Sequence, residues 1–156
     1  MIGFGYDVHR LVGGIPFILG GVTIDYSKGL LGHSDGDVLT HAIIDAILGA
    51  SAQGDIGIWF PDSDDKYKGY RSIKMLEKVI ENLNSFEIIN IDSSIVIQTP
   101  KMQKYADEIR KTLSSACKID ENRINVKFKT EEFLGFTGNG DGVKAYAICE
   151  LKHISG

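Results

Sequence analysis

Histidines and carboxylates that could bind a metal gather near the start of the sequence. Three of the four histidines lie within the first 41 residues, and Asp7 stands two positions before His9. On a β-strand, side chains at i and i+2 project to the same face, so Asp7 and His9 can converge on one ion. His41 and Asp45 share one face if their segment is helical. The spacing is compatible with a metal site, although an Asp-x-His triplet alone also occurs as a pair of hydrogen-bonding residues.

Two histidines and one carboxylate, with a fourth position left open, form the ligand set of a catalytic zinc site. We predict that Asp7, His9 and His41 bind Zn²⁺ in this way. A fourth protein ligand would close the site to substrate, so Asp45 is expected to orient one of the histidines through a hydrogen bond. The alternative is that His41 and Asp45 form an exposed helix pair and that His33 is a loop histidine.

The elements that must position these side chains can be placed from hydrophobic periodicity and turn residues. The segments expected to form strands are residues 2–9, 17–19, 22–24, 88–98, 124–130 and 143–151. Helices are expected over residues 36–52, with Ser34 or Asp35 as the N-cap, and over residues 70–83. A third helix is expected to start at Thr99-Pro100, because proline suits the first helical position. Residues 54–69 and 131–142 are expected to form loops.

These elements predict one domain over residues 1–156. Its fold class is α/β (α+β), a sandwich in which helices cover one face of a single mixed sheet. We expect a ferredoxin-like arrangement of these layers. The other face of the sheet then needs cover. Because residues 88–98 and 124–130 carry long apolar runs, self-association through that face is the expected solution.

Composition excludes several classes of protein. The chain of 156 residues is 43% hydrophobic, and its net charge of −4 offers no basic stripe for a nucleic acid. It has no uncharged apolar run of the length that a membrane span needs, about 18 residues. Its two cysteines match no metal or redox spacing, which is typical of buried thiols in a reducing compartment. We expect a cytoplasmic protein, or a plastid stromal one if a targeting segment preceded Met1.

Six short runs, in order and at near-family spacing, resemble the signatures of the 2-C-methyl-D-erythritol 2,4-cyclodiphosphate synthase family. They are Gly5-Tyr6-Asp7-Val8-His9, His33-Ser34-Asp35-Gly36-Asp37, Gly54-Asp55-Ile56-Gly57, Phe60-Pro61-Asp62-Ser63-Asp64, Pro100-Lys101-Met102 and Leu134-Gly135-Phe136-Thr137-Gly138. Together they span almost the whole chain. The resemblance implies an enzyme that converts 4-diphosphocytidyl-2-C-methyl-D-erythritol 2-phosphate to the 2,4-cyclodiphosphate and releases CMP, in the non-mevalonate pathway to isoprenoid precursors.

The resemblance also implies cofactors, an assembly and roles for particular residues. The zinc ion would act as a Lewis acid, and Glu132 would hold Mg²⁺ or Mn²⁺ on the nucleotide phosphates. His33 and Thr130 would stabilise charge on the attacking side and the leaving side of the reaction. The family is a homotrimer whose active sites are shared between neighbouring subunits.

The substrate-binding residues that the resemblance implies are Phe136 and Asn139 of the glycine-rich loop and three further groups. Those near the metal and the attacking phosphate are Asp7, Val8, His9, His33 and Ser34. Those around the erythritol are Asp55, Ile56, Gly57, Phe60, Pro61, Asp62, Ser63 and Asp64. Those around the cytosine and the nucleotide phosphates are Ile97, Gln98, Thr99, Pro100, Lys101, Met102, Gln103, Lys129, Thr130, Glu131 and Glu132.

Two positions depart from the family pattern. Relatives often carry an arginine in the Gly-Phe-Thr-Gly-x-Gly loop, where it can hold an anion in the central cavity of the trimer, and this chain has Asn139 there. Phe136 could still line an apolar tunnel, but an isoprenoid diphosphate is expected to bind weakly. Lys129 replaces a small hydroxyl residue that is common in relatives.

Two other functions are compatible with these residues. A zinc-dependent phosphohydrolase of a nucleotide diphosphate ester would use the same ligands, with hydroxide in the open position. An oligomeric nucleotide-binding module would bind its ligand without turnover. The reaction product separates the first alternative from a cyclodiphosphate synthase, and the presence of turnover separates the second.

Overall fold

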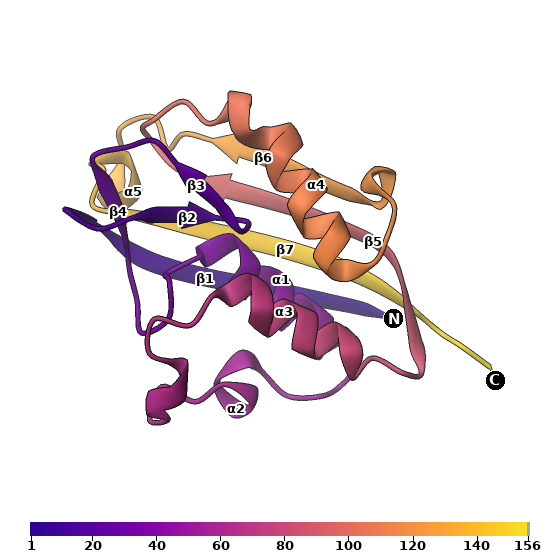
Figure 1. Ribbon diagram of the computed structural model, residues 1–156. Helices are drawn as coiled ribbons and strands as arrows, with labels where there is room; N and C mark the ends of the chain where they lie inside the picture. Colours follow the sequence, from indigo (N-terminus) through magenta and orange to yellow (C-terminus); the bar gives the residue numbers. More distant parts are fainter. Residues whose placement is uncertain (156) are drawn as a thin grey trace.

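The computed structural model describes residues 1–155 and is built on a five-stranded sheet (Figure 1). In spatial order the strands are β4 (Lys28–Leu31), β1 (Ile2–Gly13), β7 (Gly142–His153), β5 (Phe86–Val96) and β6 (Ile124–Lys129). β5 and β6 run parallel and the other neighbours run antiparallel, so the predicted mixed sheet is confirmed. β2 (Phe17–Leu19) and β3 (Val22–Ile24) form a separate hairpin, as predicted.

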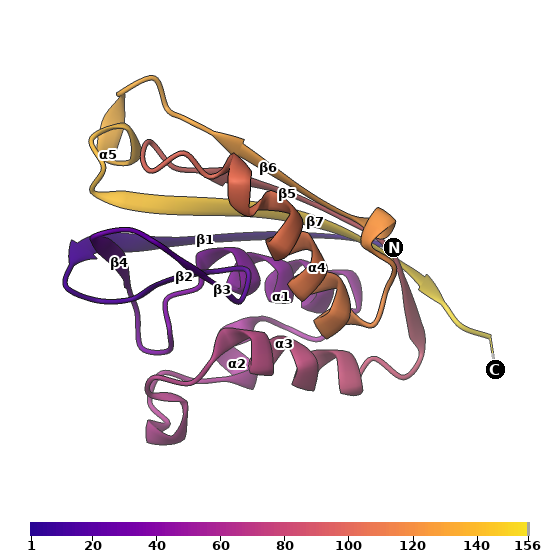
Figure 2. The ribbon, with the colours of Figure 1, turned by 45° about the horizontal axis from the view of Figure 1, so that its top comes forward.

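Three helices lie on one face of this sheet, as Figure 2 shows. They are α1 (Val38–Ala50), α3 (Ser72–Glu81) and α4 (Ala106–Cys117). The shorter pieces are the one-turn helices α2 (Ile56–Trp59) and α5 (Gly135–Gly138) and the 3₁₀ turns Asp65–Tyr67, Gln103–Tyr105 and Glu121–Arg123. The hydrophobic core lies between the helices and the sheet, which confirms the predicted layers.

The order of connections differs from the expected ferredoxin-like sandwich. That arrangement follows the order β-α-β-β-α-β. Here α4 joins the two parallel strands β5 and β6, and β7 then returns between β1 and β5. Hydrophobic patterns report which face of an element is buried but not how the elements connect, so the sequence did not separate the two arrangements.

The cap of α1 is Asp37 rather than the predicted Ser34 or Asp35. The Asp37 carboxylate accepts the Thr40 N–H at 3.0 Å and the Thr40 hydroxyl at 2.7 Å. It is fully buried and also accepts the two N–H groups of the β2–β3 turn. One side chain therefore ties the start of α1 to the hairpin.

The third helix starts later than the proline at position 100 predicts. α4 begins at Ala106, after the 3₁₀ turn over Gln103–Tyr105. The residues before it carry Met102 to the core, where its side chain is 3% exposed. The core face of this helix includes Ile109 and Leu113, which are fully buried.

α1 is buried along almost its whole length and lies very close to β1. A Cβ atom at Gly5 would overlap the Ala42 carbonyl oxygen of α1, and one at Gly3 would overlap the next turn of the helix. The following residue on this face of β1 is Asp7, and the residue before Ala42 is His41. The two glycines therefore set the distance between the strand that carries Asp7 and the helix that carries His41.

The other face of the sheet is open and apolar along β1 and β7. Ile2, Phe4 and Ile148 are 66%, 61% and 49% exposed, and none of the helices α1, α3 and α4 covers this side (Figure 2). The expectation that residues 88–98 and 124–130 supply the apolar contact is wrong. Most of their apolar side chains pack in the core under the helices, and the ion pair of Asp92 and Lys127 stands on the open side.

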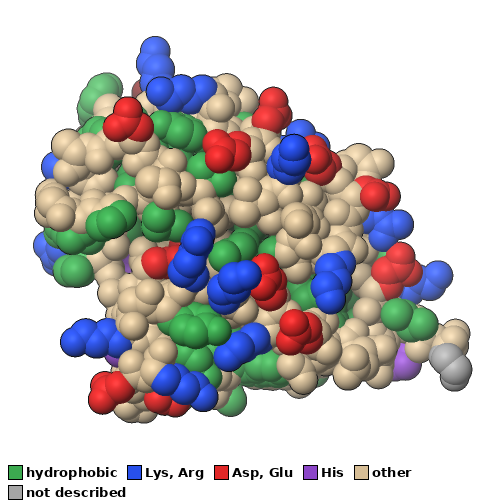
Figure 3. Space-filling view, viewed as in Figure 1, with side chains coloured by type: hydrophobic (Ala, Val, Ile, Leu, Met, Phe, Trp, Pro, Cys, Tyr) green, Lys and Arg blue, Asp and Glu red, His purple; other side chains and the backbone are tan. Residues whose placement is uncertain are grey.

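The helix-bearing side of the molecule carries charges of both signs (Figure 3). Lysines and acidic residues alternate over α3, where Lys74 and Glu77 form an ion pair at 3.1 Å. Opposite charges therefore offset one another locally on this side. Within residues 1–155, each helix is too short or too polar to cross a membrane.

Candidate metal centre and its cavity

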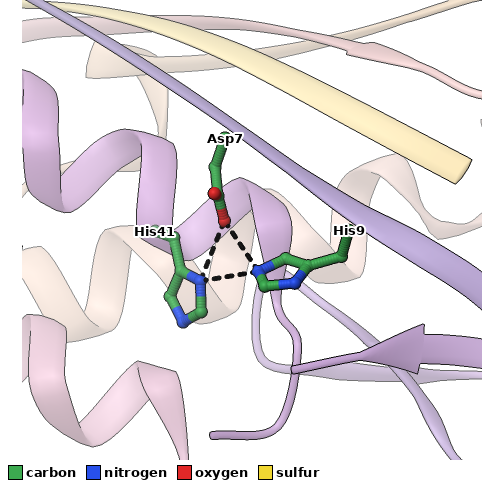
Figure 4. A group of neighbouring side chains, drawn as sticks. All are labelled: Asp7, His9 and His41. Carbon is green, nitrogen blue, oxygen red and sulfur yellow. Dashed lines mark hydrogen bonds and ion pairs between the residues drawn. The ribbon is translucent and has the colours of Figure 1, made fainter. Parts of the chain in front are cut away.

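Asp7, His9 and His41 converge at one point between β1 and α1 (Figure 4). His9 Nε2 lies 2.9 Å from Asp7 Oδ2, and His41 Nδ1 lies 3.0 Å from the same oxygen. The two ring nitrogens are 3.2 Å apart. One ligand atom from each residue lies within 4.8 Å of the others, so the three side chains are close enough to share an ion.

The hydrogen bonds of His9 direct its free electron pair to this point. His9 Nδ1 lies 2.9 Å from the Leu31 carbonyl oxygen, which only accepts, so neutral His9 carries its proton on Nδ1 and leaves Nε2 free. Asp7 faces the same point with a carboxylate. Electron-pair donors that face one another this closely repel unless a proton or a metal ion lies between them, and two imidazoles with one carboxylate suit a divalent transition metal. The residues present therefore fit a metal ion.

The charges of these side chains follow from their burial and mutual contact. Burial raises the pKa of Asp7, but the nearby His41 and His9 rings outweigh this effect and hold the pKa at about 2. Burial lowers the pKa of His9, but contact with Asp7 outweighs burial and shifts it upward from 6.5. Protons therefore compete with a cation for His9 near neutral pH, whereas Asp7 is ionised.

Asp45 does not orient a histidine as predicted. Its Oδ1 accepts the Ile56 N–H at 2.8 Å and so holds the start of α2. The group nearest His41 Nε2 is the Ser72 hydroxyl at 2.7 Å, with the Ser34 hydroxyl at 3.1 Å. Ser72 belongs to α3 and comes beside His41 only through the packing of two helices, so no local spacing in the sequence reveals it.

The three candidate ligands open into a cavity of about 210 Å³. The residues that line it are Asp7, His9, His33, Ser34, His41, Asp45, Ile56, Gly57, Phe60, Asp62, Tyr67 and Met75. The sequence did not predict Tyr67 or Met75, because the first stands in a polar segment and the second reads as a helix core residue. Within the predicted erythritol group, Asp55 and Asp64 accept N–H groups that start α2 and a 3₁₀ turn. Val8 points to the open face of the sheet, where it is 40% exposed.

The two segments predicted to bind the nucleotide lie beside each other but outside this cavity. The Ile97 N–H donates to the Lys129 carbonyl at 2.9 Å, and the Phe133 N–H donates to the Gln98 side chain at 3.1 Å. β6 is the third strand from β1, and at about 4.8 Å per strand this places it roughly 14 Å away. Within residues 1–155, the cavity lining draws no residue from either segment.

Thr130 and Glu132 are exposed in the turn that follows β6. Glu132 has a left-handed backbone φ of 55°, and its neighbour Glu131 pairs with Lys144 at 2.7 Å. A single exposed carboxylate is compatible with a hard cation that keeps several waters. Asn139, at the end of α5, is also exposed and adds no charge there.

Comparison with known proteins gives the chain a consistent set of relatives. Residues 1–152 match the YgbB family. The chain is 56% identical over 156 residues to the 2-C-methyl-D-erythritol 2,4-cyclodiphosphate synthase of Lachnospira eligens, covering 99% of this chain and 85% of that protein. It is 57% identical over 152 residues to the synthase of the same name from Clostridium perfringens, covering 96% of this chain and 97% of that protein.

Solved structures agree with these sequence matches. The bifunctional IspDF from Campylobacter jejuni matches with a TM-score of 0.95 and 40% identity over 99% of this chain, which spans 42% of that longer chain. The CDP complex of IspF from Plasmodium falciparum matches with a TM-score of 0.87 and 34% identity, covering 99% of this chain and 96% of that chain. Both resemblances extend over the whole sheet and its helices.

Proposed function

Because the chain belongs to the YgbB family, we propose that it closes the ring of 2-C-methyl-D-erythritol 2,4-cyclodiphosphate with release of CMP. The substrate is 4-diphosphocytidyl-2-C-methyl-D-erythritol 2-phosphate, in the non-mevalonate pathway to isoprenoid precursors. The observation that carries the proposal is the convergence of Asp7, His9 and His41 on one cavity in a chain with these relatives. Residues 1–156 then act as one synthase domain, and a cytoplasmic location is part of the proposal.

The proposal assigns Zn²⁺ to Asp7, His9 and His41 and assigns Mg²⁺ or Mn²⁺ to Glu132. Three protein ligands would leave one zinc position for the substrate, and the exposed Glu132 would meet a cation carried by nucleotide phosphates. When bound, these cations neutralise phosphate charge and polarise the phosphorus that is attacked.

The chain's own side chains position the phosphate that attacks. His33 and Ser34 line the cavity beside the candidate metal ligands, where both can donate hydrogen bonds to phosphate oxygens. The wall that contains Ile56 and Gly57 faces the same space and is assigned to the erythritol. Phe60 and Tyr67 are each 6% exposed and exclude water, which is the competing nucleophile. The 2-phosphate oxygen forms the new bond to phosphorus and CMP leaves, so no water is consumed.

The nucleotide end of the site comes from a neighbouring subunit in this proposal. Residues 97–103 and 129–132 lie outside the cavity of their own chain, and the apolar open face of β1 and β7 offers a surface for a homotrimer. Thr130 would then stabilise charge on the leaving phosphate beside the metal centre of the next subunit. Relatives solved with CDP support a cytidine nucleotide as the ligand of this segment.

Phosphorus NMR of the reaction mixture tests the proposed activity. We expect the cyclic diphosphate and CMP to form in equal amounts. A linear monophosphate without the cyclic product would identify a phosphohydrolase, and binding without turnover would identify a nucleotide-binding module. The variant His41→Ala should lose zinc and turnover together, and stoichiometric zinc in that variant would refute the ligand assignment.

A further inference from the structure

Two polar side chains without a role in the reaction described above stand behind His41. Ser72, the first residue of α3, is fully buried. Its hydroxyl lies 2.7 Å from His41 Nε2 and makes a short hydrogen bond with Asp35 Oδ1. The Ser72 N–H donates to the other oxygen of Asp35 at 3.0 Å. Asp35, Ser72 and His41 therefore form a continuous chain of hydrogen bonds that ends at a candidate metal ligand.

The number of protons in this chain fixes the direction of each bond. An ionised carboxylate only accepts, and Asp35 also receives the Asp37 N–H at 3.1 Å. The single proton of the Ser72 hydroxyl is therefore donated to Asp35. The Ser72 oxygen has only electron pairs left for His41, so His41 Nε2 must carry a proton and donate it.

This arrangement leaves His41 Nδ1 without a proton. Nδ1 is the atom that lies 3.0 Å from Asp7 Oδ2 and 3.2 Å from His9 Nε2. We propose that Ser72 and Asp35 are positioning residues that hold His41 in the tautomer whose free Nδ1 faces the metal. The proposal rests on the metal site assigned above and adds the pair of residues that prepares one of its ligands.

Ser72 and Asp35 matter because the carboxylate of Asp7 favours the other tautomer of His41, with the proton on Nδ1. With a proton on Nδ1, His41 could donate a hydrogen bond to Asp7, and that proton would occupy the place of the metal. The Asp35–Ser72 pair opposes this outcome by accepting a proton at Nε2. The Ser34 hydroxyl also lies 3.1 Å from His41 Nε2 and can accept the same proton. Only the Ser72 hydroxyl, however, has its own proton committed to the carboxylate of Asp35.

The pair also links the metal ligand to two walls of the cavity. Asp35 belongs to the turn that carries His33 and Ser34, and Ser72 follows the segment that carries Phe60 and Tyr67. A direct backbone bond, from the Gly69 N–H to the His33 carbonyl at 2.8 Å, joins the same two segments. Packing of these walls therefore decides where the Ser72 hydroxyl stands relative to His41.

The variant Ser72→Ala tests the proposal by two measurements on the full chain. Competition with a chelator should show zinc affinity lowered about 10–100-fold, the usual loss when a group that orients a metal ligand is removed. Proton–nitrogen NMR of the metal-free chain should show the His41 proton on Nε2 in the wild type and a shift toward Nδ1 in the variant. The control Ser114→Ala removes another buried serine, whose hydroxyl bonds only within α4, and should change neither result.

The variant Asp35→Asn keeps the test decisive if Ser72→Ala fails to fold. An asparagine offers one acceptor oxygen in place of two, which frees the Ser72 hydroxyl to donate to His41 Nε2, so the tautomer should shift in the same direction. Wild-type zinc affinity in both variants, or a wild-type His41 with its proton on Nδ1, would overturn the proposal. A wild-type chain that binds no zinc would instead overturn the metal assignment, while the metal-free spectra would still decide the tautomer.

Discussion

The affinity of the centre for a cation depends on the protonation of one histidine. Burial lowers the pKa of His9, but contact with Asp7 outweighs it and leaves the pKa above 6.5. A cation must displace that proton, so affinity should fall by about tenfold per pH unit as the pH drops below the raised pKa. The pKa of Asp7, about 2, keeps it ionised throughout. Chelator competition at a series of pH values measures this, and an affinity that is constant from about pH 5 to pH 8 would contradict it.

Asp37 should contribute more to stability than any exposed aspartate. Its buried carboxylate accepts the N–H groups of Gly20, Gly21 and Thr40 and the Thr40 hydroxyl. Each buried donor left without a partner costs about 1–3 kcal/mol, so Asp37→Ala should lower the free energy of unfolding by about 3 kcal/mol or more in urea. The control Asp120→Ala changes an exposed residue that makes no capping bond and should stay within about 0.5 kcal/mol. Equal losses in the two variants would contradict the role of Asp37.

Local spacing explains which site residues the sequence could predict. Asp7 and His9 obey the two-residue period of a strand, and that pattern survives in the folded chain. Asp45 lies one helical turn after His41, but its carboxylate accepts a hydrogen bond from the Ile56 N–H instead of one from the histidine. Ser72 obeys no pattern with His41, because the contact depends on how α3 packs against α1. The ligands were therefore predictable, whereas the groups behind them required the structure.

At the scale of elements, periodicity located the parts that are buried on one side. α1, α3 and the β2–β3 hairpin lie within the segments where their patterns place them. β4 was not predicted, because four residues are too few to show a periodic pattern. The strand forms only by pairing with residues 10–13 of β1, and the sequence of β4 itself does not reveal this pairing. The order in which the strands are connected in the sheet could not be predicted either, because the burial pattern of single residues does not depend on it.

The close contact of α1 with β1 predicts a strong effect of one methyl group. In Gly5→Ala the new Cβ would meet the Ala42 backbone, so α1 must move away from β1. We expect a loss of about 1–3 kcal/mol in the free energy of unfolding, typical of overpacking, together with weaker zinc binding because His41 moves with the helix. Gly13→Ala is the matched control, since a Cβ there meets no atom within 4 Å. Zinc affinity that is unchanged in Gly5→Ala would show that the glycine does not set the spacing of the ligands.

At the scale of the whole molecule, a charge introduced on the open face of β1 and β7 is expected to prevent assembly of the chains. Ile148 pairs with Phe4 on β1 and with Asp92 on β5. In Ile148→Glu a carboxylate would be buried beside apolar side chains in a trimer, so we expect the particle mass to fall to that of one chain, with zinc retained and turnover lost. Ile154→Glu, at a similarly exposed isoleucine beyond β7, should leave mass and turnover unchanged. A trimeric, active Ile148→Glu protein would contradict assembly through this face.

The proposed sharing of sites between subunits also predicts that two inactive variants can restore activity together. His41→Ala removes the metal half of the proposed site, and Thr130→Ala removes a residue of the nucleotide half. If the two halves come from neighbouring subunits, trimers formed by co-expressing the two variants contain some intact sites. Random mixing in equal amounts should give about one quarter of the wild-type rate. Mixed particles that are as inactive as either parent would show that each chain supplies its own complete site.

The burial of α1 sets the timescale on which His41 can leave its place. Eleven of its residues are buried, from Val38 to Ala50, and they are enclosed by the sheet and by α3. Backbone amides in such an element exchange with solvent deuterium chiefly when the whole domain opens, whereas exposed segments exchange through small local fluctuations. The amide of His41 should therefore be among the slowest to exchange, and those of residues 54–69 and 130–135 among the fastest. One candidate metal ligand is thus expected on the slowest-exchanging part of the chain, and the segments assigned to the substrate on faster-exchanging parts.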